Sequence, residues 1–484
     1  MKKISIIAIS IGLILSACTK DLSTVNIDPK SSSVAIPTAV FLQGEKNLVD
    51  AITSTSVASA PFRVLSQEWT ENSYTYEAQY NLAAYQSPNG WWNALYVNVL
   101  HNLDNAKKSF PIDFKGDDVT LRNDLDITDL LEIYSYYLLV ATYGDIPYSQ
   151  ALNTSIPFPK YDDAKTIYTD LLTRVDSCIA GINTTEGAMG SADQIYEGNT
   201  TEWLKFAASL KLKMAMLLAT EDPTTAAQKV NEAIQTGVFT SNADNALFAY
   251  DPASPANSNP IWQALVLSGR HDFLPANLLV NTMVAWNDPR LPLYFAQYPA
   301  GSGTYKGGIP GAGNGYGTAS DFSSQLQQAN YPGDLMDYSE VEFYLAEAAA
   351  QGFITTGGSA ASYYNDAITA SIEFWGGTDA QAATYLAQPS VAYATATGTW
   401  QQKIGYQEWI SYYNQNWDSW TVIRRLGYPN VDAVNPPVNA QGNLPLRYYY
   451  PTNETTSNPV NWAAATALLP GGQDVVSAKL FWEQ

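Results

Sequence analysis

The sequence predicts a mainly α-helical fold of packed helix pairs joined by long irregular loops. The clearest helix signal lies in residues 401–429, where large aromatic side chains recur at helical spacing. A second signal lies in residues 338–375, where two apolar stripes flank a turn that contains glycine. The third is compositional, because 46% hydrophobic and 15% charged residues over 484 positions supply a large core. No low-complexity segment divides the chain after its first few dozen residues, so we expect one domain over residues 36–484.

The first residues form a predicted secretory leader. A basic start at Met1–Lys3 precedes an apolar run, Ile4–Leu15, that is too short for a stable membrane-spanning helix. The Leu-Ser-Ala-Cys sequence that ends at Cys18 resembles the bacterial lipobox, in which the cysteine becomes the lipidated first residue. Residues 1–17 are therefore a predicted lipoprotein signal peptide, and the alternative is an ordinary signal peptide with an incidental Cys18. Residues 18–35 are rich in Ser, Thr, Asp and Pro, which suits a flexible tether after a lipidated cysteine.

Helical spacing and capping residues recur along the body of the chain. Asn199 and Glu202 have the spacing of a capping box, and Asp222 stands as a cap before a first-turn proline. Cys178 lies on an apolar helical face, where we expect an inert buried thiol. The stretch 66–88 is aromatic and polar and shows no clean period. The predicted helices are Phe41–Ile52, Trp91–Ala106, Thr128–Tyr143, Ile167–Ile182, one from Asn199 through Leu217 and one from Pro223 to Gly237.

The helix pair in residues 338–375 looks like a tetratricopeptide unit, because small residues lie at the expected crossing and the turn is short. The regular period of about 34 residues is not visible along the chain, so we expect irregular, interrupted helix pairs. Between the helices, residues 294–331 form a glycine-rich excursion. A loop of this length in a compact domain is usually either functional or disordered.

The segment 401–429 is interpreted as one core helix. Its aromatic face is expected to pack against protein rather than ligand, since aromatic stripes at helical spacing usually do so. Arg424 and Arg425 lie in the last turn, where we expect them to cap the helix or pair internally, and Gly427 and Pro429 end the helix. The aromatic face consists of Tyr406, Trp409, Tyr413, Trp417 and Trp420, and the opposite face of Gln407, Ser411, Asn414 and Asp418.

Charge and residue counts exclude several classes of function. A net charge of −21 makes nucleic acid and anionic membrane surfaces poor partners. The sequence has two histidines, His101 and His271, no CxxC pair and no phosphate-binding glycine loop, so no metal or cofactor is expected. A lipidated Cys18 would leave Cys178 without a disulfide partner. Two classes stay open: a surface glycosidase that uses a pair of carboxylates, and an adhesion component whose helix pairs bind protein.

Ordered landmarks along the chain carry a resemblance to a known family. The chain resembles a SusD/RagB-type nutrient-binding outer-membrane lipoprotein of Bacteroidota, and the likeness spans nearly the whole sequence. One departure is Ile423, where relatives often have a polar residue before the arginine pair. The landmarks are the lipobox Cys18, Tyr143–Tyr148, the helix at Trp203–Met214, Asp288–Arg290, Gly303–Gly308, Tyr338–Gly352, the helix at 408–429 and the ending Ala478–Glu483.

The resemblance implies a SusD-like fold over four tetratricopeptide-like units, with the protein anchored by lipid on the outer membrane at the cell surface. It further implies capture of an oligosaccharide, and delivery to a partner SusC-like TonB-dependent transporter barrel, without catalysis. In RagB-like relatives the cargo is a peptide, which stays an alternative. The composition agrees in part, because the 32 Tyr and 13 Trp residues offer rings for sugar faces.

Loop aromatics are the predicted ligand contacts, since a ring on irregular polar sequence has less reason to lie in the core. Trp69, Tyr74, Tyr76, Tyr80 and Trp91, with Asn72 and Asn81 as polar neighbours, form the first group. Trp262, Arg270, Phe273, Tyr305 and Tyr316 form the second group.

Overall fold

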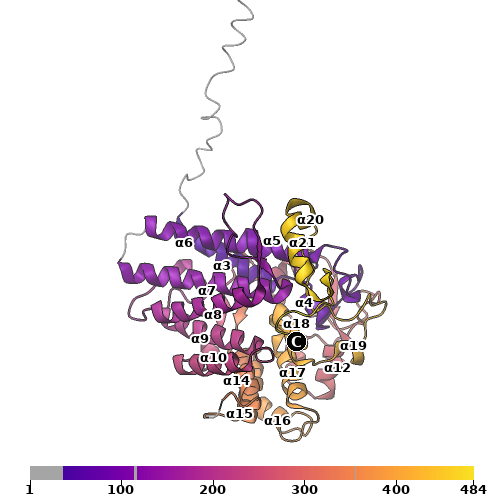
Figure 1. Cartoon of the computed structure of the whole chain (residues 1–484). Coiled ribbons are helices and arrows are strands. Elements are labelled where there is room, and N and C mark those ends of the chain that lie inside the picture. Colours follow the sequence, from indigo (N-terminus) through magenta and orange to yellow (C-terminus); the bar gives the residue numbers. More distant parts are fainter. Residues whose placement is uncertain (1–35, 114–116, 355, 484) are drawn as a thin grey trace, which may run out of the picture.

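The computed structural model describes residues 36–113, 117–354 and 356–483. Eight long helices in this part of the chain pack as four pairs, and Figure 1 shows them stacked from α6 and α3 at the top to α15 at the bottom. This arrangement confirms the predicted helical fold with tetratricopeptide-like pairs. The pairs are α3 (Pro37–Thr53) with α6 (His101–Asp113), α7 (Asp118–Tyr143) with α8 (Ala164–Gly181), α9 (Thr200–Leu217) with α10 (Pro223–Thr236), and α14 (Tyr338–Ala350) with α15 (Ala360–Phe374).

Short helices and loops make up the other side of the molecule, around α17 and α18 (Figure 1). Three two-stranded antiparallel sheets join β1 to β5, β2 to β3 and β4 to β6. The strands are β1 (Trp69–Glu71), β2 (Ile146–Pro147), β3 (Tyr161–Asp162), β4 (Ala246–Phe248), β5 (Phe273–Pro275) and β6 (Gly333–Met336). The remaining α-helices are α4 (Phe62–Leu65), α5 (Ser87–Asn93), α11 (Pro260–Trp262), α12 (Asn277–Ala285), α13 (Leu291–Tyr294), α16 (Asp379–Leu386), α17 (Trp400–Ser411), α18 (Asn416–Leu426), α19 (Val431–Val434), α20 (Glu454–Ser457) and α21 (Pro459–Leu468). Other helical turns are η1 (Glu77–Gln79), η2 (Ala94–Leu100), η3 (Gly190–Ala192), η4 (Asn242–Asp244), η5 (Pro255–Asn257), η6 (Gln263–Leu267), η7 (Tyr412–Asn414) and η8 (Pro470–Gly472).

Side-chain caps start the long helices where the sequence places them. Asn199 accepts hydrogen bonds from the backbone N–H groups of Thr201 and Glu202, and Asp222 accepts one from Thr225. The reciprocal half of the expected capping box is not formed, because the Asn199 N–H donates to the Tyr196 carbonyl at 2.9 Å and the Glu202 side chain pairs with Lys205 at 3.3 Å. Each cap satisfies N–H groups that have no partner inside their own helix.

The predicted helix at 401–429 is in fact two helices, so the interpretation as one helix is wrong. The chain breaks between α17 and α18 at Gln415, whose backbone angles are φ −114° and ψ 80°. The Gln415 side chain donates to Glu340 Oε2 at 3.0 Å, and this contact with α14 lies beyond the reach of a local pattern. The supposed polar face is also buried, from Gln407 at 1% exposed to Asp418 at 6%. Helix α18 and the second half of α17 are therefore enclosed by other parts of the molecule. The expectation of a fully buried aromatic face is wrong for Tyr406, which is half-buried at the wall of a hollow.

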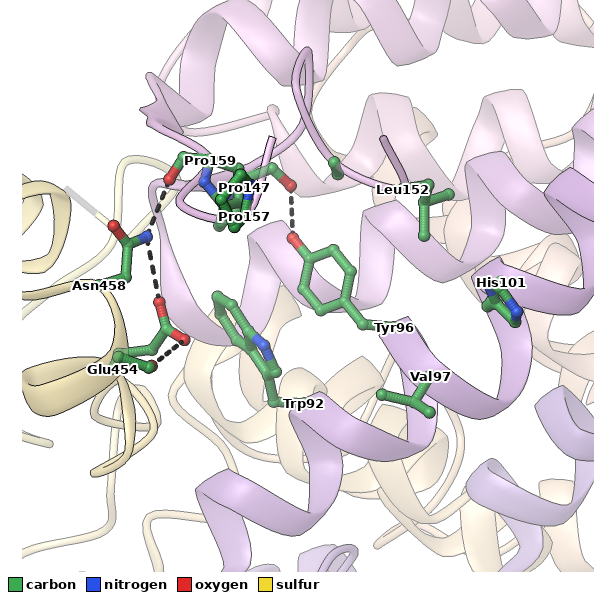
Figure 2. Close-up of a pocket in the computed structure, with 12 residues that line it drawn as sticks. Trp92, Tyr96, Val97, His101, Pro147, Leu152, Pro157, Pro159, Glu454 and Asn458 are labelled. Atoms are coloured by element: carbon green, nitrogen blue, oxygen red, sulfur yellow. Dashed lines mark hydrogen bonds between the residues drawn. The ribbon is translucent and has the colours of Figure 1, made fainter. Parts of the chain in front are cut away.

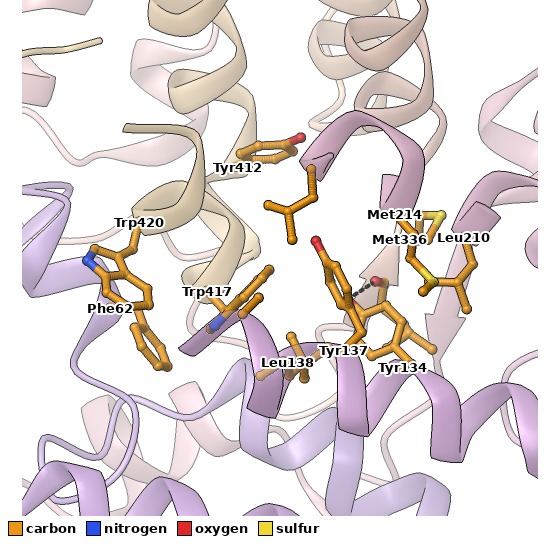
Figure 3. Close-up of a cluster of buried hydrophobic side chains, with 14 of the residues drawn as sticks. Phe62, Tyr134, Tyr137, Leu138, Leu210, Met214, Met336, Tyr412, Trp417 and Trp420 are labelled. Atoms are coloured by element: carbon orange, nitrogen blue, oxygen red, sulfur yellow. Dashed lines mark hydrogen bonds between the residues drawn. The ribbon is translucent and has the colours of Figure 1, made fainter. Parts of the chain in front are cut away.

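The aromatic side chains of α18 are core, as predicted. Trp417 is 1% exposed, and its ring meets that of Tyr137 edge-on with 5.3 Å between centroids (Figure 3). The Trp417 indole N–H donates to Thr142 Oγ1 at 2.9 Å, which satisfies the one polar group of the side chain. Trp420 stacks on Phe62 at 5.2 Å, so α18 joins α7 to the N-terminal part of the chain.

The end of α18 also agrees with the sequence analysis. Gly427 has φ 77° and donates its N–H to the Ile423 carbonyl at 2.8 Å, which is a left-handed cap. Arg424 pairs with Glu483 at 2.9 Å, and Arg425 pairs with Glu347 and Glu408. Both arginines are therefore internal, as expected. Likewise Cys178 is a buried free thiol.

The glycine-rich segment 294–331 packs against the body of the molecule. A Cβ on Gly307 would lie 2.4 Å from Asn277 Cα, so a larger residue could not approach this backbone. At Gly311, where φ is 75°, a Cβ would lie 2.2 Å from the Val438 carbonyl oxygen. The signal peptide and tether predicted for residues 1–35 lie outside the described residues. Within those residues, every helix is too short or too polar to cross a bilayer.

Candidate functional site

Exposed tyrosines gather on the loop that follows β1. Tyr74 is 63% exposed, Tyr76 42% and Tyr85 40%. The rings of Tyr76 and Tyr85 meet edge-on, with 5.9 Å between centroids. We call Tyr74, Tyr76, Tyr85 and the similarly exposed Tyr316 the tyrosine patch. Large rings that solvent can reach on one loop lie outside the core and are available for contact with a ligand.

The pairing of β1 with β5 positions this loop. Asn72 continues the pairing beyond the strand, because its backbone N–H donates to the Asp272 carbonyl at 2.7 Å. Its side-chain amide donates to the His271 carbonyl at 3.0 Å, and its own carbonyl accepts from the Asn314 N–H at 3.1 Å. Asn72 thus holds together three segments that are far apart in the sequence.

The backbone around the patch is held in uncommon conformations. Of the eight non-glycine residues with positive φ in the described chain, four lie between Gln67 and Gln86. Tyr74 and Tyr80 are two of them, with φ of 60° and 63°. Such conformations cost energy and persist where the surrounding structure enforces them, which occurs often at ligand sites.

A cation and further rings border the patch on the β5 side. Arg270 is exposed and pairs with Asp272 at 2.5 Å, and this carboxylate raises the pKa of the guanidinium, with smaller contributions from Tyr74 and Tyr85. His271 stacks on Tyr316 with 4.0 Å between ring centroids. Asn72, His271 and Tyr316 line a shallow hollow of about 160 Å³. Rings, an amide and a guanidinium on one surface fit a polar ligand that also has apolar faces.

Two carboxyl groups lie beneath the patch. Glu71 and Glu77 are 3% and 0% exposed, and Glu71 accepts a hydrogen bond from the Ala78 N–H at 3.1 Å. Burial raises the pKa of Glu71 to about 7, and burial together with the charge of Glu71 raises that of Glu77 to about 9. A glycosidase needs two carboxyl groups that reach a sugar and a water molecule. This pair is sealed from both, so it does not support the glycosidase alternative.

A separate hollow of about 380 Å³ lies between η2, the loop after β2, and α20. Figure 2 shows Trp92 and Tyr96 on one side and Pro147, Pro157 and Pro159 on the other. The polar groups here bind one another: Tyr96 donates to the Pro147 carbonyl at 2.5 Å. Asn458 similarly donates to the Pro159 carbonyl at 2.9 Å. With these polar atoms already paired, the hollow is mainly apolar, and we favour the tyrosine patch as the candidate site.

Comparison with known proteins decides the family. A SusD-like family model, described as "Starch-binding associating with outer membrane", matches residues 29–451. The chain belongs to the SusD-like family. No curated protein matches the sequence. The family description and two of the similar structures refer to binding, in agreement with a non-enzymatic protein.

Solved structures of the SusD-like family share the fold over nearly the whole chain. A protein described as a chitin-binding protein is 25% identical, with a TM-score of 0.79, and the match covers 93% of this chain and 100% of that one. A chitin-binding SusD homologue from Flavobacterium johnsoniae is 22% identical, with a TM-score of 0.77 and coverage of 92% and 98%. A SusD homologue from Bacteroides fragilis is 23% identical, with a TM-score of 0.77 and coverage of 93% and 100%.

Within this SusD-like fold, the predicted ligand contacts fall into two sets. The expectation of exposed loop rings is wrong for Trp69, Tyr80 and Trp91, which are at most 5% exposed. Trp69 lies 4.2 Å from Phe322 between ring centroids, and Trp91 lies 5.0 Å from Phe62, so both are core. The structure gathers Asn72, Tyr74, Tyr76, Arg270, Phe273 and Tyr316 around the patch. Asn81 is half-buried in the same loop, where its backbone N–H donates to the Tyr76 carbonyl at 2.8 Å, and Trp262 and Tyr305 are half-buried.

Sequence reasoning missed two members of the candidate site. Tyr85 lies in the same irregular stretch as Tyr76, so its loop position was a usable signal. His271 had no such signal, because its role depends on stacking with Tyr316 from a different segment. Which of these residues contact a ligand stays a prediction.

Proposed function

We propose that this SusD-like protein captures an oligosaccharide at the cell surface through the tyrosine patch and delivers it to a SusC-like TonB-dependent transporter. The observation that carries the proposal is the group of exposed rings on a loop whose backbone is firmly held. Sugar rings present C–H faces that pack on tyrosine, and their hydroxyl groups pair with Asn72 and Arg270. The starch-binding description of the family and the chitin-binding relatives support a glycan as the ligand.

We also infer that residues 36–484 act as one ligand-binding domain. One buried apolar cluster includes side chains from Phe41 to Trp482, which supports a single folding unit. Delivery to a transporter is tested by copurification: the lipidated protein, extracted in mild detergent, is expected to bring a large barrel protein with it. A protein recovered alone under those conditions would favour the adhesion alternative.

Loss of a patch ring is expected to weaken glycan binding without changing stability. Tyr76→Ala should lower the affinity for the best ligand among chito- and malto-oligosaccharides about tenfold, because a stacked ring contributes both buried area and a specific contact. Isothermal titration calorimetry measures the affinity, and thermal unfolding checks the fold.

Phe158→Ala is the matched control for Tyr76→Ala, since Phe158 is 60% exposed and lies outside the patch. Its affinity should equal that of the wild type. Equal affinity in the Tyr74→Ala, Tyr76→Ala and Tyr85→Ala variants would exclude the patch as the binding surface. If peptides bind and saccharides do not, the cargo is peptide rather than glycan.

Anchoring is expected to depend on Cys18. Cys18→Ala should release a folded protein into the soluble fraction and abolish labelling by a radioactive fatty acid, because lipid attachment needs this thiol. Cys178→Ala is the control, since it removes the other cysteine of the chain and should leave labelling intact. Labelling of the Cys18→Ala variant would contradict a lipoprotein.

A further inference from the structure

A third hollow with different chemistry lies between α12, the loop 389–397 and the start of α17. Its volume is about 500 Å³, and Trp286 and Tyr406 contribute half-buried rings to its wall. The two rings meet edge-on, with 5.6 Å between centroids. We call this hollow the Trp286 pocket. It shares no lining residue with the tyrosine patch.

Several polar groups of the Trp286 pocket are unpaired. Among the described residues, no hydrogen-bond partner exists for the Trp286 indole N–H, the Tyr406 hydroxyl or the side-chain amides of Asn281 and Gln402, and none of these groups is sealed from solvent. In the hollow of Figure 2, the tyrosine and asparagine side chains are bonded to carbonyl groups, while the Trp92 indole N–H has no partner among the described residues. Unpaired donors and acceptors beside ring faces are what a polyhydroxylated ligand requires.

The charge of the pocket disfavours cationic ligands. Its described lining has no acidic residue, and its one basic group, Lys403, donates to the Tyr393 carbonyl at 2.8 Å and lies over the Tyr393 ring. The carbonyl and the ring hold this ammonium at the wall, where it keeps its charge and further donors for ligand oxygen atoms. Ligands with hydroxyl or amide groups fit this lining.

One short segment connects the Trp286 pocket with the loop of the tyrosine patch. Asn435 lines the pocket, and its side-chain amide donates to Gln67 and Asn277 at 2.7 Å each. Six residues later, the Gln441 N–H donates to the carbonyl of Gln79, which lies in the patch loop. Six residues of extended chain span at most about 20 Å, so Asn435 at the pocket lies within about 20 Å of Gln441, which contacts the patch loop.

From these contacts we infer that the Trp286 pocket is a second saccharide subsite, which binds a neutral sugar of the same chain that the tyrosine patch holds. The inference rests on the proposed glycan-binding function. Two linked subsites raise the affinity for long chains over short ones, because the second contact is made within the complex. The protein would then favour polymeric over monomeric sugar at the cell surface.

The test uses calorimetry with chitobiose and chitohexaose, and with the matching malto-oligosaccharides. The pocket variant is Asn281→Ala with Gln402→Ala, which removes polar groups from the surface and leaves both rings in place. We expect it to bind the long chain about two- to tenfold more weakly, the usual effect of losing hydrogen bonds of ordinary strength. The Tyr76→Ala variant retains the Trp286 pocket. Calorimetry of this variant with the disaccharide should therefore still show binding at one site.

A more conservative variant distinguishes the loss of a pocket contact from the loss of the fold. Tyr406→Phe keeps the ring and removes the hydroxyl, and unfolding temperatures identify any variant that fails to fold. If saccharides bind, and the pocket variant and Tyr406→Phe both retain wild-type affinity for the long chain, the second subsite is excluded while the patch stands. If the wild-type protein binds no saccharide, both the proposed glycan-binding function and the second subsite are excluded. Binding of neutral peptides to the pocket in place of sugars would overturn the saccharide assignment.

Discussion

Replacing Trp417 by alanine is expected to lower the free energy of unfolding by about 3–5 kcal/mol, the usual cost of deleting a buried large aromatic side chain. The ring is 1% exposed and packs on Tyr137, so its loss leaves a cavity between α18 and α7. The hydroxyl of Thr142 also loses the indole N–H that it accepts. Urea unfolding followed by circular dichroism measures the difference.

Trp417→Phe serves as the control, because it keeps part of the ring volume and removes the indole N–H. Its loss of stability should lie between that of the wild type and that of the alanine variant. An alanine variant with the stability of the wild type but no ligand binding would mean that α18 presents a binding face, contrary to its position in Figure 3.

The sequence alone predicted the layer of packed helices, because helices are marked by patterns within a few residues of one another. Caps such as Asn199 and the glycine stop at Gly427 depend on hydrogen bonds within a few residues, and both are confirmed. The break at Gln415 was missed, since it depends on Glu340 in a helix far along the chain. Local periodicity continues through such a break, and long-range contacts decide it.

In the candidate site as well, long-range contacts that the local sequence does not show decide which side chains are buried. Trp69 and Tyr74 lie five residues apart in one irregular stretch, yet Trp69 is 1% exposed and Tyr74 is 63% exposed. Phe273 and Phe322 cover Trp69, and both come from distant segments. Irregular polar sequence therefore indicated the loop of the candidate site, but it did not distinguish the rings that face solvent from the rings that support the loop.

A buried ion network at the centre of the molecule was also invisible in the sequence. Lys213 of α9 lies 2.7 Å from Glu340 of α14 and 2.7 Å from Asp418 of α18. The side chains of Lys213 and Glu340 are fully buried, and that of Asp418 is 8% exposed. Gln415 and Tyr344 donate further hydrogen bonds to Glu340 at 3.0 Å each. One lysine thus neutralises carboxylates from two other helices, and the network joins the helix layer to α18.

Lys213→Met is expected to lower the free energy of unfolding by about 3–5 kcal/mol at neutral pH, because it leaves buried carboxylates without a cation. The loss should grow with pH. Burial raises the pKa of Glu340 from 4.5 to about 7 even beside Lys213, whose charge acts to lower it. Without the lysine the folded-state pKa rises further. An acid with a higher pKa in the folded state binds more protons there than in the unfolded state, so stability falls as pH rises from the unfolded pKa to the folded pKa.

The triple variant Lys213→Met, Glu340→Gln, Asp418→Asn separates charge from packing. Neutral amides of similar shape need no cation, so this variant should recover most of the lost stability and lose the added pH dependence. Urea unfolding at about pH 5 and about pH 8 measures both effects for wild type and variants. If Lys213→Met loses the same free energy at both pH values, and the triple variant recovers none of it, then Lys213 stabilises the core through hydrogen bonds of its ammonium group, such as that to the Tyr134 hydroxyl at 3.3 Å. The carboxylates of Glu340 and Asp418 would then be neutral in the native protein, and the joining of three helices would rest on hydrogen bonds rather than on charge.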